Sequence, residues 1–176
     1  MNYNTISLFK IEIHKFSIKE WKSKKDDILS LVPFDNEEFT GLINYTDFHA
    51  LDEKPYQKEF FSLLEPYLSE FRRNCEYQFK EMSEMWCQRY YKNEYHPPHD
   101  HGAIGYSAVF YASLDNNVHD STLFYSPLQG LNGIREDPQS IKVSEGDLII
   151  FPANLLHMAP AHQSEKERTI ISFNLL

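Results

Sequence analysis

The stretch YHPPHDHG, Tyr95–Gly102, holds three of the chain's 8 histidines beside an aspartate. In an extended strand, side chains at positions i and i+2 point to the same face. His99 and His101 therefore point together, while Asp100 points to the opposite face. The preceding Pro97–Pro98 favours an extended path for the backbone. The stretch thus predicts a pair of imidazoles presented together at a strand end.

A pair of histidines beside prolines is often only part of a surface loop, so a metal site needs a third ligand. Neutral imidazole is a common protein donor to transition metals. His157 is the best further candidate, because it follows GDLIIFPANLL, where Pro152 stops a buried strand and the chain re-emerges at a histidine. His96 has the parity of Asp100 if the strand is regular that far back. His162 lies in a polar run and is expected to be solvated.

Arg168 lies eleven residues beyond His157 and opens the segment RTIISFN. The same period-two rule puts Ser172 and Asn174 on the face of the strand that carries Arg168. An arginine at a strand start is usually a surface cation, but this one shares its face with two polar residues close to a candidate metal ligand. An inward guanidinium would be a forked receptor for a carboxylate.

Length and composition predict one folded domain over residues 1–176. Hydrophobic residues make up 41% and charged residues 24% of the chain, which is ordinary for a globular protein. The aromatic share of 15% favours β structure and a core built from large rings. The net charge of -9 argues against duplex nucleic acid as a partner.

The compartment is expected to be the cytoplasm. No apolar run reaches the ~18 residues of a membrane-spanning helix, so no membrane partner is expected. Met1–Lys10 lacks the charged start and apolar run of a signal peptide. The two cysteines, Cys75 and Cys87, form no dense disulfide framework. These features are typical of a reducing compartment.

The first part of the chain predicts one strand followed by a helix. Ile6–Phe16 alternates apolar and polar residues with period two, as a half-buried strand does. Ser17–Leu31 predicts an amphipathic helix that ends before a proline. Ser17 is its expected N-cap, with Glu20 three residues later as the capping-box partner.

Pro55–Met85 carries apolar residues at steps of three and four, which predicts the main helical stretch, with a break or kink at Pro66. From Trp86 the period changes to two. The expected strands are Trp86–Tyr91, Tyr106–Leu114, Thr122–Ser126, Ser140–Val143, Asp147–Phe151 and Thr169–Leu175. Residues 1–85 thus supply a strand and supporting helices, and 86–176 form the β core of a helix-backed antiparallel sandwich or jelly roll.

The chain resembles the 2-oxoglutarate- and Fe(II)-dependent oxygenases in four segments and in their order. These segments are WCQRYYKNEYHPPHDH, YSAVFYASLD, GDLIIFPANLLHMAP and ERTIISFN. The resemblance is greatest to the small microbial and phage branch related to prolyl hydroxylases. WKSKKDDILSLV near the N-terminus is similar in style, so the resemblance covers most of the chain. It implies a double-stranded β-helix, a cupin-like jelly roll, with the metal at the mouth of the barrel.

The resemblance implies Fe(II) as the metal and assigns its ligands. His99 matches the first histidine of the family's H-x-D/E motif, and His157 matches the distal histidine. The carboxylate position of the motif reads His101 here. A three-histidine site carries one negative charge less than the usual two histidines and one carboxylate, which weakens the hold on Fe(II). Asp100 would be the ligand instead only if a bulge reversed the local parity.

The resemblance also assigns residues to the cosubstrate, 2-oxoglutarate. Arg168 matches the basic residue that pairs with its far carboxylate. Ser172 matches a hydroxyl position that often assists this arginine. Tyr111 matches an aromatic position that often touches the cosubstrate, and Tyr91 is a weaker candidate for that role.

Three hypotheses about function follow. The leading one is a hydroxylase-type oxygenase that uses Fe(II), 2-oxoglutarate and O₂ to oxidise a C–H bond of a small molecule or a protein side chain. The second is a cupin-type dioxygenase with three histidines and no 2-oxoglutarate, in which Arg168 holds the substrate's carboxylate. The third is a non-catalytic jelly-roll module with a closed, four-coordinate zinc site. The sequence leaves the substrate and the oligomeric state open.

Overall fold

The computed structural model describes residues 10–39, 43–50, 53–128, 130, 133–134 and 136–176. The elements in chain order are β1 (His14–Ser17), α1 (Trp21–Ser30), the 3-10 helix η1 (Glu37–Phe39), β2 (Tyr45–Thr46), α2 (Gln57–Asn74), β3 (Met82–Tyr90), β4 (His96–His99), β5 (Tyr106–Ser113), β6 (Leu123–Phe124), β7 (Gln139–Ser140), β8 (Asp147–Pro152), β9 (His157–Ala159) and β10 (Arg168–Leu175). Neither described α-helix is long and apolar enough to cross a membrane.

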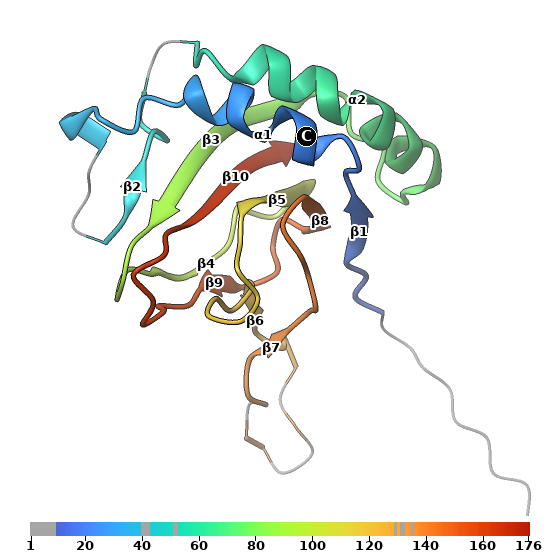
Figure 1. Cartoon of the computed structure of the whole chain (residues 1–176). Coiled ribbons are helices and arrows are strands. Elements are labelled where there is room, and N and C mark those ends of the chain that lie inside the picture. Colours follow the sequence, from blue (N-terminus) through green and yellow to red (C-terminus); the bar gives the residue numbers. More distant parts are fainter. Residues whose placement is uncertain (1–9, 40–42, 51–52, 129, 131–132, 135) are drawn as a thin grey trace, which may run out of the picture.

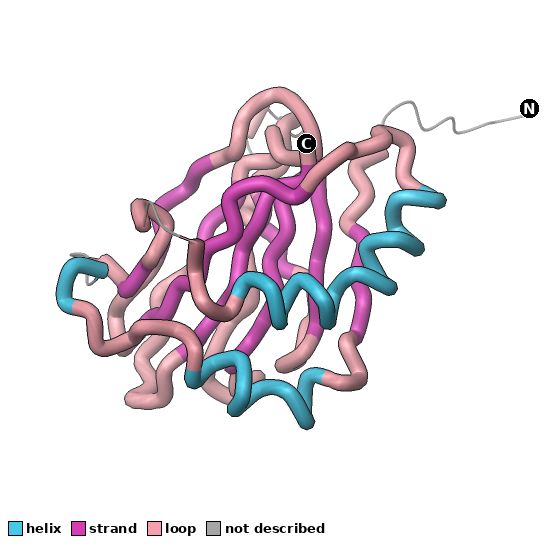
Figure 2. The backbone as a smooth tube through the Cα atoms, turned by 90° about the horizontal axis from the view of Figure 1, so that it is seen from above, coloured by secondary structure: helices cyan, strands magenta, loops and turns pink. Residues whose placement is uncertain are grey.

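Two antiparallel sheets form the body of the molecule. The larger has the strand order β1-β8-β5-β10-β3-β2, and the smaller has the order β4-β9-β6-β7. Figure 1 shows the smaller sheet on one side of the larger one and the two α-helices on the other side, and Figure 2 shows these helices lying across the strands. This arrangement confirms the predicted fold class, a helix-backed double-stranded β-helix.

The outer core lies between the helices and the larger sheet. Trp21 of α1, Phe60 of α2 and Phe110 of β5 are buried there. Their rings meet edge to face, with centroids 4.7 Å apart for Trp21 and Phe110 and 5.0 Å apart for Phe60 and Phe110. Trp21 also donates its indole N–H to the carbonyl of Ala112, 3.1 Å away. These contacts fix both helices on the sheet.

The inner core lies on the other face of the larger sheet, inside the barrel. It contains buried residues of both sheets, among them Tyr90, Val109, Tyr111, Phe124 and Phe151. The strands of the larger sheet are buried on both faces, because one face of this sheet packs on the helices and the other face packs on the smaller sheet. This packing explains why the residues of β5, β8 and β10 are buried almost without interruption.

The predicted capping box at Ser17 is wrong. Helix α1 begins at Trp21 with Glu20 as its N-cap and no capping hydrogen bond from a side chain. Ser17 is instead the last residue of β1, and its hydroxyl donates to the carboxylate of the buried Asp147, 2.6 Å away. The strand expected over Ile6–Phe16 is confirmed for its last part, while residues 6–9 lie outside the described residues.

The helical stretch predicted for Pro55–Met85 is too long. Helix α2 ends at Asn74 and Cys75 is extended, so the segment that leads to β3 is not helical. Pro66 lies inside α2 without ending it. The proline removes one backbone donor, but the stripe of buried apolar side chains on α2 still packs on the sheet, which outweighs that loss.

Strands β3, β5, β6, β7, β8 and β10 confirm the six strands expected after residue 85, with shifted ends. β2, β4 and β9 were not predicted. They have two to four residues each, and β4 contains Pro97–Pro98. These strands are too short to show the alternation of apolar and polar residues. Prolines also argue against a strand, because they have no backbone N–H to donate to a neighbouring strand.

Truncation of Phe60 tests the outer core. Phe60→Ala leaves a cavity under α2 and is expected to lower the free energy of unfolding by about 3–5 kcal/mol, measured by urea denaturation. The neighbouring Phe61 is 44% exposed, so Phe61→Ala is the matched control, with an expected loss below about 1 kcal/mol. Equal losses in the two variants would contradict this packing.

Candidate metal centre

Three histidines from two neighbouring strands and the turn that follows β4 converge inside the barrel. The pairing of β4 with β9 sets His99 directly opposite His157. Their ring centroids are 4.4 Å apart, and the ring of His101 lies 5.1 Å from His99 and 5.2 Å from His157. One ring nitrogen from each of the three lies within 4.8 Å of the others. The structure therefore brings together the three residues expected to bind a metal.

Hydrogen bonds to the backbone orient two of these rings. Nδ1 of His99 lies 2.8 Å from the carbonyl oxygen of Pro97, and Nδ1 of His157 lies 2.8 Å from that of Leu155. A carbonyl only accepts, so each Nδ1 carries the hydrogen and each Nε2 keeps a free lone pair. This is the tautomer that binds a metal through Nε2. His101 is placed by its ring stacks on His157 and on Trp86.

The three imidazoles are neutral at pH 7. Burial lowers the pKa of His157 to about 3 and that of His101 to about 4, and it also lowers the pKa of His99. Neighbouring imidazoles lower the pKa of His157 and His101 further. A metal ion therefore displaces no proton from these rings. Three neutral nitrogen donors on converging strands fit a ferrous ion.

Asp100 lies outside this group. Its side chain is exposed, and its Oδ1 accepts a hydrogen bond from the backbone N–H of Gly102, 3.0 Å away. The geometry thus matches the period-two prediction for His99, Asp100 and His101. The bulge that would have brought Asp100 into the group does not occur at that position.

Two other histidines differ from expectation. His96 does not face away, because the pairing with β9 is irregular between His96 and His99 and the two rings lie 4.1 Å apart. Gln88 donates to Nδ1 of His96, 2.9 Å away. His162 is buried rather than solvated, and its Nε2 lies 3.2 Å from the carbonyl of Tyr90. The polar sequence around His162 hides this inward side chain.

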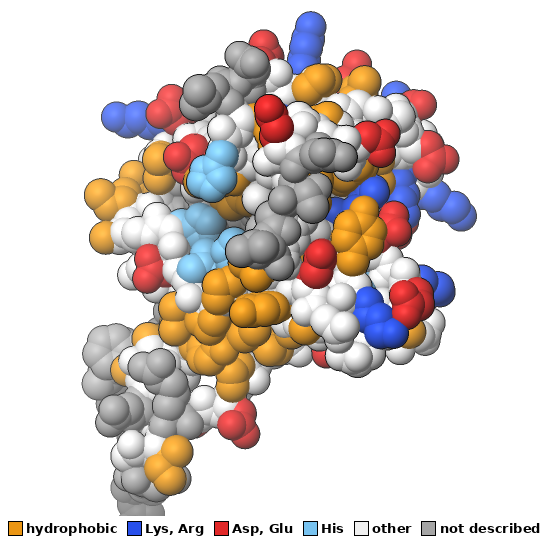
Figure 3. Space-filling model, turned by 90° about the vertical axis from the view of Figure 1, so that its left-hand side faces the viewer, with side chains coloured by type: hydrophobic (Ala, Val, Ile, Leu, Met, Phe, Trp, Pro, Cys, Tyr) orange, Lys and Arg blue, Asp and Glu red, His pale blue; other side chains and the backbone are white. Residues whose placement is uncertain are grey.

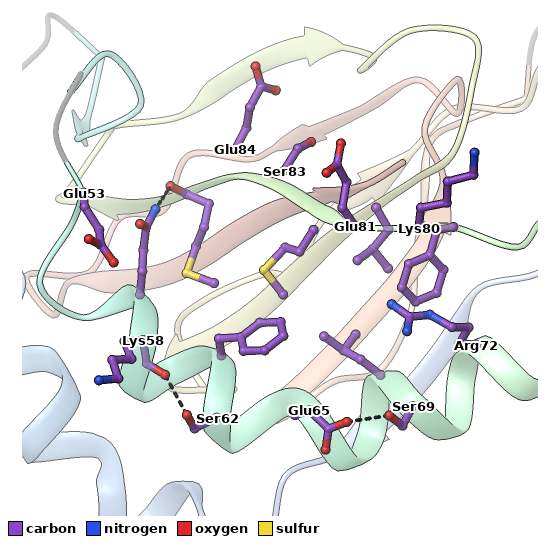
Figure 4. Close-up of a pocket in the computed structure, with 17 residues that line it drawn as sticks. Glu53, Lys58, Ser62, Glu65, Ser69, Arg72, Lys80, Glu81, Ser83 and Glu84 are labelled. Carbon is purple, nitrogen blue, oxygen red and sulfur yellow. Dashed lines mark hydrogen bonds between the residues drawn. The ribbon is translucent and has the colours of Figure 1, made fainter.

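The three histidines line a narrow pocket between the sheets, with Trp86, Tyr90, Thr122, Phe151, Ile170 and Ser172 among its walls. Figure 3, which shows the left-hand side of Figure 1, has histidine side chains gathered beside a hydrophobic patch. A larger cavity of about 640 Å³ lies elsewhere, between α2 and β3 (Figure 4), and neither a histidine nor Arg168 lines it. Cavity size therefore does not locate the chemistry here.

Arg168, at the start of β10, points into the barrel and is only 2% exposed. Its two terminal nitrogens donate to the carbonyls of Asp120 and Pro160, both at 2.8 Å. The guanidinium carbon lies 4.7 Å from the ring centroid of Tyr90. Its Nε is buried and has no hydrogen-bond partner among the described residues. The guanidinium is thus fixed in place and still has donors to offer.

Of Ser172 and Tyr111, the two residues matched to the cosubstrate, only Ser172 lines the histidine pocket, while Tyr111 lies in the inner core. Tyr111 is buried, and its hydroxyl donates to Oγ1 of Thr122, 2.9 Å away, while it accepts from the Thr122 backbone N–H at 3.2 Å. Thr122 lines the same pocket, so Tyr111 reaches the pocket wall through this residue.

Tyr91 is not brought to the pocket. It is 46% exposed and lies just past the end of β3. Its neighbour Tyr90 pairs with Arg168 across the strands and is fully buried, and its hydroxyl has no hydrogen-bond partner among the described residues. The period-two rule contained this signal, because Trp86, Gln88 and Tyr90 share one face and all three line the pocket.

A barrel of this kind with three inward imidazoles and a buried arginine is typical of a class of mononuclear, non-haem metal proteins. A family model described as "Putative 2OG-Fe(II) oxygenase" matches residues 84–174, more than half of the chain. The chain belongs to the 2OG-Fe(II) oxygenase family. No curated protein sequence matches it.

Solved structures of other oxygenases share the fold. A collagen prolyl hydroxylase of Paramecium Bursaria Chlorella virus-1 aligns with 92% of this chain and 94% of its own, at 12% identity and a TM-score of 0.63. A prolyl-4-hydroxylase of Pseudomonas putida aligns over 93% and 91%, at 10% identity and 0.65. HygX of Streptomyces hygroscopicus, with nickel, 2-oxoglutarate and hygromycin B bound, aligns over 92% and 81%, at 14% identity and 0.64.

The family fixes the class of reaction. The protein is an oxygenase with Fe(II) as its metal, 2-oxoglutarate as its cosubstrate and O₂ as its oxidant. This confirms the first of the three hypotheses from the sequence. The roles of individual residues and the identity of the substrate are proposals, which follow below.

The lowered pKa of His157 predicts how the stability of the metal-free protein depends on pH. The unfolded chain has the ordinary histidine pKa of 6.5, so below this pH it binds a proton that the folded chain does not. The free energy of unfolding therefore falls as the pH drops. This one residue accounts for about 2 kcal/mol between pH 6.5 and pH 5. Urea denaturation at the two pH values measures the fall.

The variant His157→Asn is the control, because asparagine does not titrate. Its loss of stability between the two pH values is expected to be smaller than that of the wild type by about the same 2 kcal/mol. An identical fall in both proteins would show that His157 is protonated equally in the folded and unfolded states.

Proposed function

We propose that His99, His101 and His157 hold Fe(II) and that Arg168 binds the far carboxylate of 2-oxoglutarate, in an enzyme that hydroxylates a C–H bond of its substrate. One observation carries this assignment: three neutral imidazoles converge within 4.8 Å in the same barrel as a buried guanidinium with an unpaired N–H. A buried donor without a partner costs free energy, which an anionic ligand would recover.

When bound, Fe(II) with 2-oxoglutarate and O₂ supplies the oxidising power for hydroxylation, with succinate and CO₂ as the other products. The chain's own residues orient the metal ligands and shield the reacting groups from water. Pro97 and Leu155 hold the imidazoles of His99 and His157 in the ligating tautomer through their carbonyls. Phe151 and Ile170 line the pocket with apolar surface and keep water away from the reacting groups.

Arg168 is the proposed anchor of the cosubstrate, and its surroundings keep it pointed inward. The carbonyls of Asp120 and Pro160 each take one hydrogen bond, and the ring of Tyr90 lies against the guanidinium. Burial lowers the pKa of Arg168, but a guanidinium remains charged at any physiological pH. The Tyr90 hydroxyl is a second unpaired polar group close to it, which supports an anion site at this end of the pocket.

Ser172 and Tyr111 have supporting roles in this proposal. Ser172 lies on the same face of β10 as Arg168 and supplies a hydroxyl to the pocket. Tyr111 holds Thr122 in the wall through two hydrogen bonds. We propose Tyr90 in place of Tyr91 as the aromatic residue beside the cosubstrate.

The substrate is either a protein side chain or a small molecule. Both kinds occur among similarly folded enzymes, since one is a collagen prolyl hydroxylase and another was solved with hygromycin B. The proposed location is the cytoplasm, which is supported by Cys75 and Cys87 as free, buried thiols.

Arg168→Lys tests the cosubstrate site. The wild type is expected to form succinate from 2-oxoglutarate only with Fe(II) present. Lysine keeps the positive charge but loses the two parallel N–H donors that a guanidinium offers to a carboxylate. The affinity for 2-oxoglutarate is therefore expected to fall about tenfold or more, while the affinity for the metal stays unchanged. Anaerobic calorimetry measures both affinities.

Arg89→Lys is the matched control, because Arg89 lies on the other face of β3 over the ring of Phe34. It is expected to bind 2-oxoglutarate as the wild type does. Unchanged affinity in Arg168→Lys would contradict the assigned role of this arginine. It would place the far carboxylate of 2-oxoglutarate on a residue other than Arg168.

His101→Asp tests the metal ligands. The change places a carboxylate in the group of three and adds a negative charge, so Fe(II) is expected to bind about tenfold more tightly or better. Asp100→Asn, at the adjacent position, is the control and is expected to leave Fe(II) affinity unaltered. Loss of Fe(II) affinity in Asp100→Asn would instead make Asp100 a ligand.

A further inference from the structure

Strand β3 carries a bulge at Glu84, two residues before Trp86, which lines the histidine pocket. Ser172 of β10 pairs with Trp86, but Asn174 pairs with Ser83, so β3 has one extra residue between these pairs. Glu84 has a φ of 48°, one of two positive values among the non-glycine residues that the structure describes. This conformation is unfavourable for a residue with a Cβ atom. Bulges of this kind often re-aim a side chain beside an active site.

The bulge directs the carboxylate of Glu84 toward the inner face of the larger sheet. Its Oε2 accepts a hydrogen bond from Nδ2 of Asn174, 3.0 Å away. Oδ1 of Asn174 in turn accepts from the hydroxyl of Ser107, also at 3.0 Å. Asn174 and Ser107 are buried, and Ser107 lines the histidine pocket. Glu84 also lines the rim of the cavity between α2 and β3, and Figure 4 shows its side chain pointing away from α2.

The side chain of Glu84 is exposed. Two hydrogen bonds in series, from Asn174 to Glu84 and from Ser107 to Asn174, nevertheless hold its carboxylate in place and connect it to the pocket wall. Glu84 forms no ion pair with any residue in the described part of the chain. The negative charge of Glu84 acts on Lys54, because it opposes the lowering of the Lys54 pKa by burial. This ammonium is occupied elsewhere, because it donates to the carbonyl of Met85 at 2.6 Å and lies 3.8 Å from Asp47.

Aromatic rings connect this carboxylate to the metal centre. Trp86, two residues along β3, stacks on the ring of His101 with centroids 5.6 Å apart. The exposed ring of Phe48 meets Trp86 edge to face at 5.0 Å. Glu84 and Phe48 line one pocket, and a fixed carboxylate beside an aromatic ring is a suitable environment for an organic cation. The net charge of -9 also attracts cations to the molecule.

We propose that Glu84 binds a positively charged amine or guanidine of the substrate while the C–H bond to be oxidised lies at the metal centre. The inference rests on the proposed function, because it takes the histidine group as the place of reaction. A free amine and a lysine side chain share the recognised chemistry. Asn174 and Ser107 act as positioning residues, since they hold the carboxylate and do not contact the cation themselves.

Paramagnetic line broadening tests this subsite in two stages. The full-length protein is first loaded with Mn(II), and water-proton relaxation measures whether the metal binds. Loss of this signal in His99→Ala tests the metal centre by itself. The proton lines of n-butylammonium, n-butanol and butyrate are then recorded with the Mn(II)-loaded protein. We expect strong broadening of the ammonium alone, because the metal broadens only molecules that bind beside it.

Glu84→Gln is expected to weaken the binding of n-butylammonium about fivefold while Mn(II) binding is retained. Glu81→Gln, at an exposed glutamate just before β3, is the matched control and should bind as the wild type does. Glu84→Gly relieves the positive φ, so it should raise the melting temperature and still lose the broadening. A higher melting temperature together with the loss of broadening would show that Glu84 recognises the cation and does not merely stabilise the fold.

Equal broadening of the three probes, wild-type binding by Glu84→Gln, or no broadening of the ammonium with Mn(II) bound would overturn the proposal. A comparison of n-butylammonium with Nα-acetyl-lysine methylamide distinguishes the two sources of the cation. Stronger broadening of the lysine derivative supports a protein side chain as substrate. Stronger broadening of the free amine supports a small molecule.

Discussion

The antiparallel pairing of β4 with β9 is the constraint on which the metal centre depends. It sets His99 opposite His157, and each of these imidazoles bonds to the backbone carbonyl two residues before it, that of Pro97 in β4 and that of Leu155 just before β9. The local backbone at each histidine therefore fixes the tautomer of its ring. Neutral rings that already pack together lose little freedom when a metal arrives, so the backbone organises the site before any ion binds.

The third histidine changes the balance of charge in this site. Two histidines and a carboxylate would reduce the charge of a ferrous ion by one, whereas three neutral imidazoles leave it unchanged. In the proposed arrangement the dianionic cosubstrate has to neutralise more of the charge, and Arg168 would compensate its far carboxylate. We infer that metal and 2-oxoglutarate depend on each other for tight binding more strongly here than in a site with a carboxylate ligand.

Much of the fold and of the candidate site could be predicted from residue spacing. Period-two alternation predicted the strands of the larger sheet other than β2, and the spacing of His99, His101, His157 and Arg168 matched the family's order. The misses have physical reasons. Local alternation does not report the irregular pairing that turns His96 inward. The buried Asp147 takes the hydroxyl of Ser17 away from helix α1, and such a contact between distant residues leaves no local signal.

Tyr90 and the bulge at Glu84 differ in this respect. Tyr90 follows from the same parity rule that selected the histidines, so its place could be predicted from the sequence. The bulge could not, because it depends on the register between β3 and β10, which are about 80 residues apart in the chain. Register between distant strands is set by packing across the whole sheet.

The most direct test of the account is a crystal structure of the protein grown with Fe(II) and 2-oxoglutarate under anaerobic conditions, with anomalous scattering at the iron edge. The account predicts one iron peak bound to Nε2 of His99, His101 and His157, with the far carboxylate of 2-oxoglutarate on Arg168. An iron peak on Asp100 or His96, or a cosubstrate carboxylate away from Arg168, would contradict it.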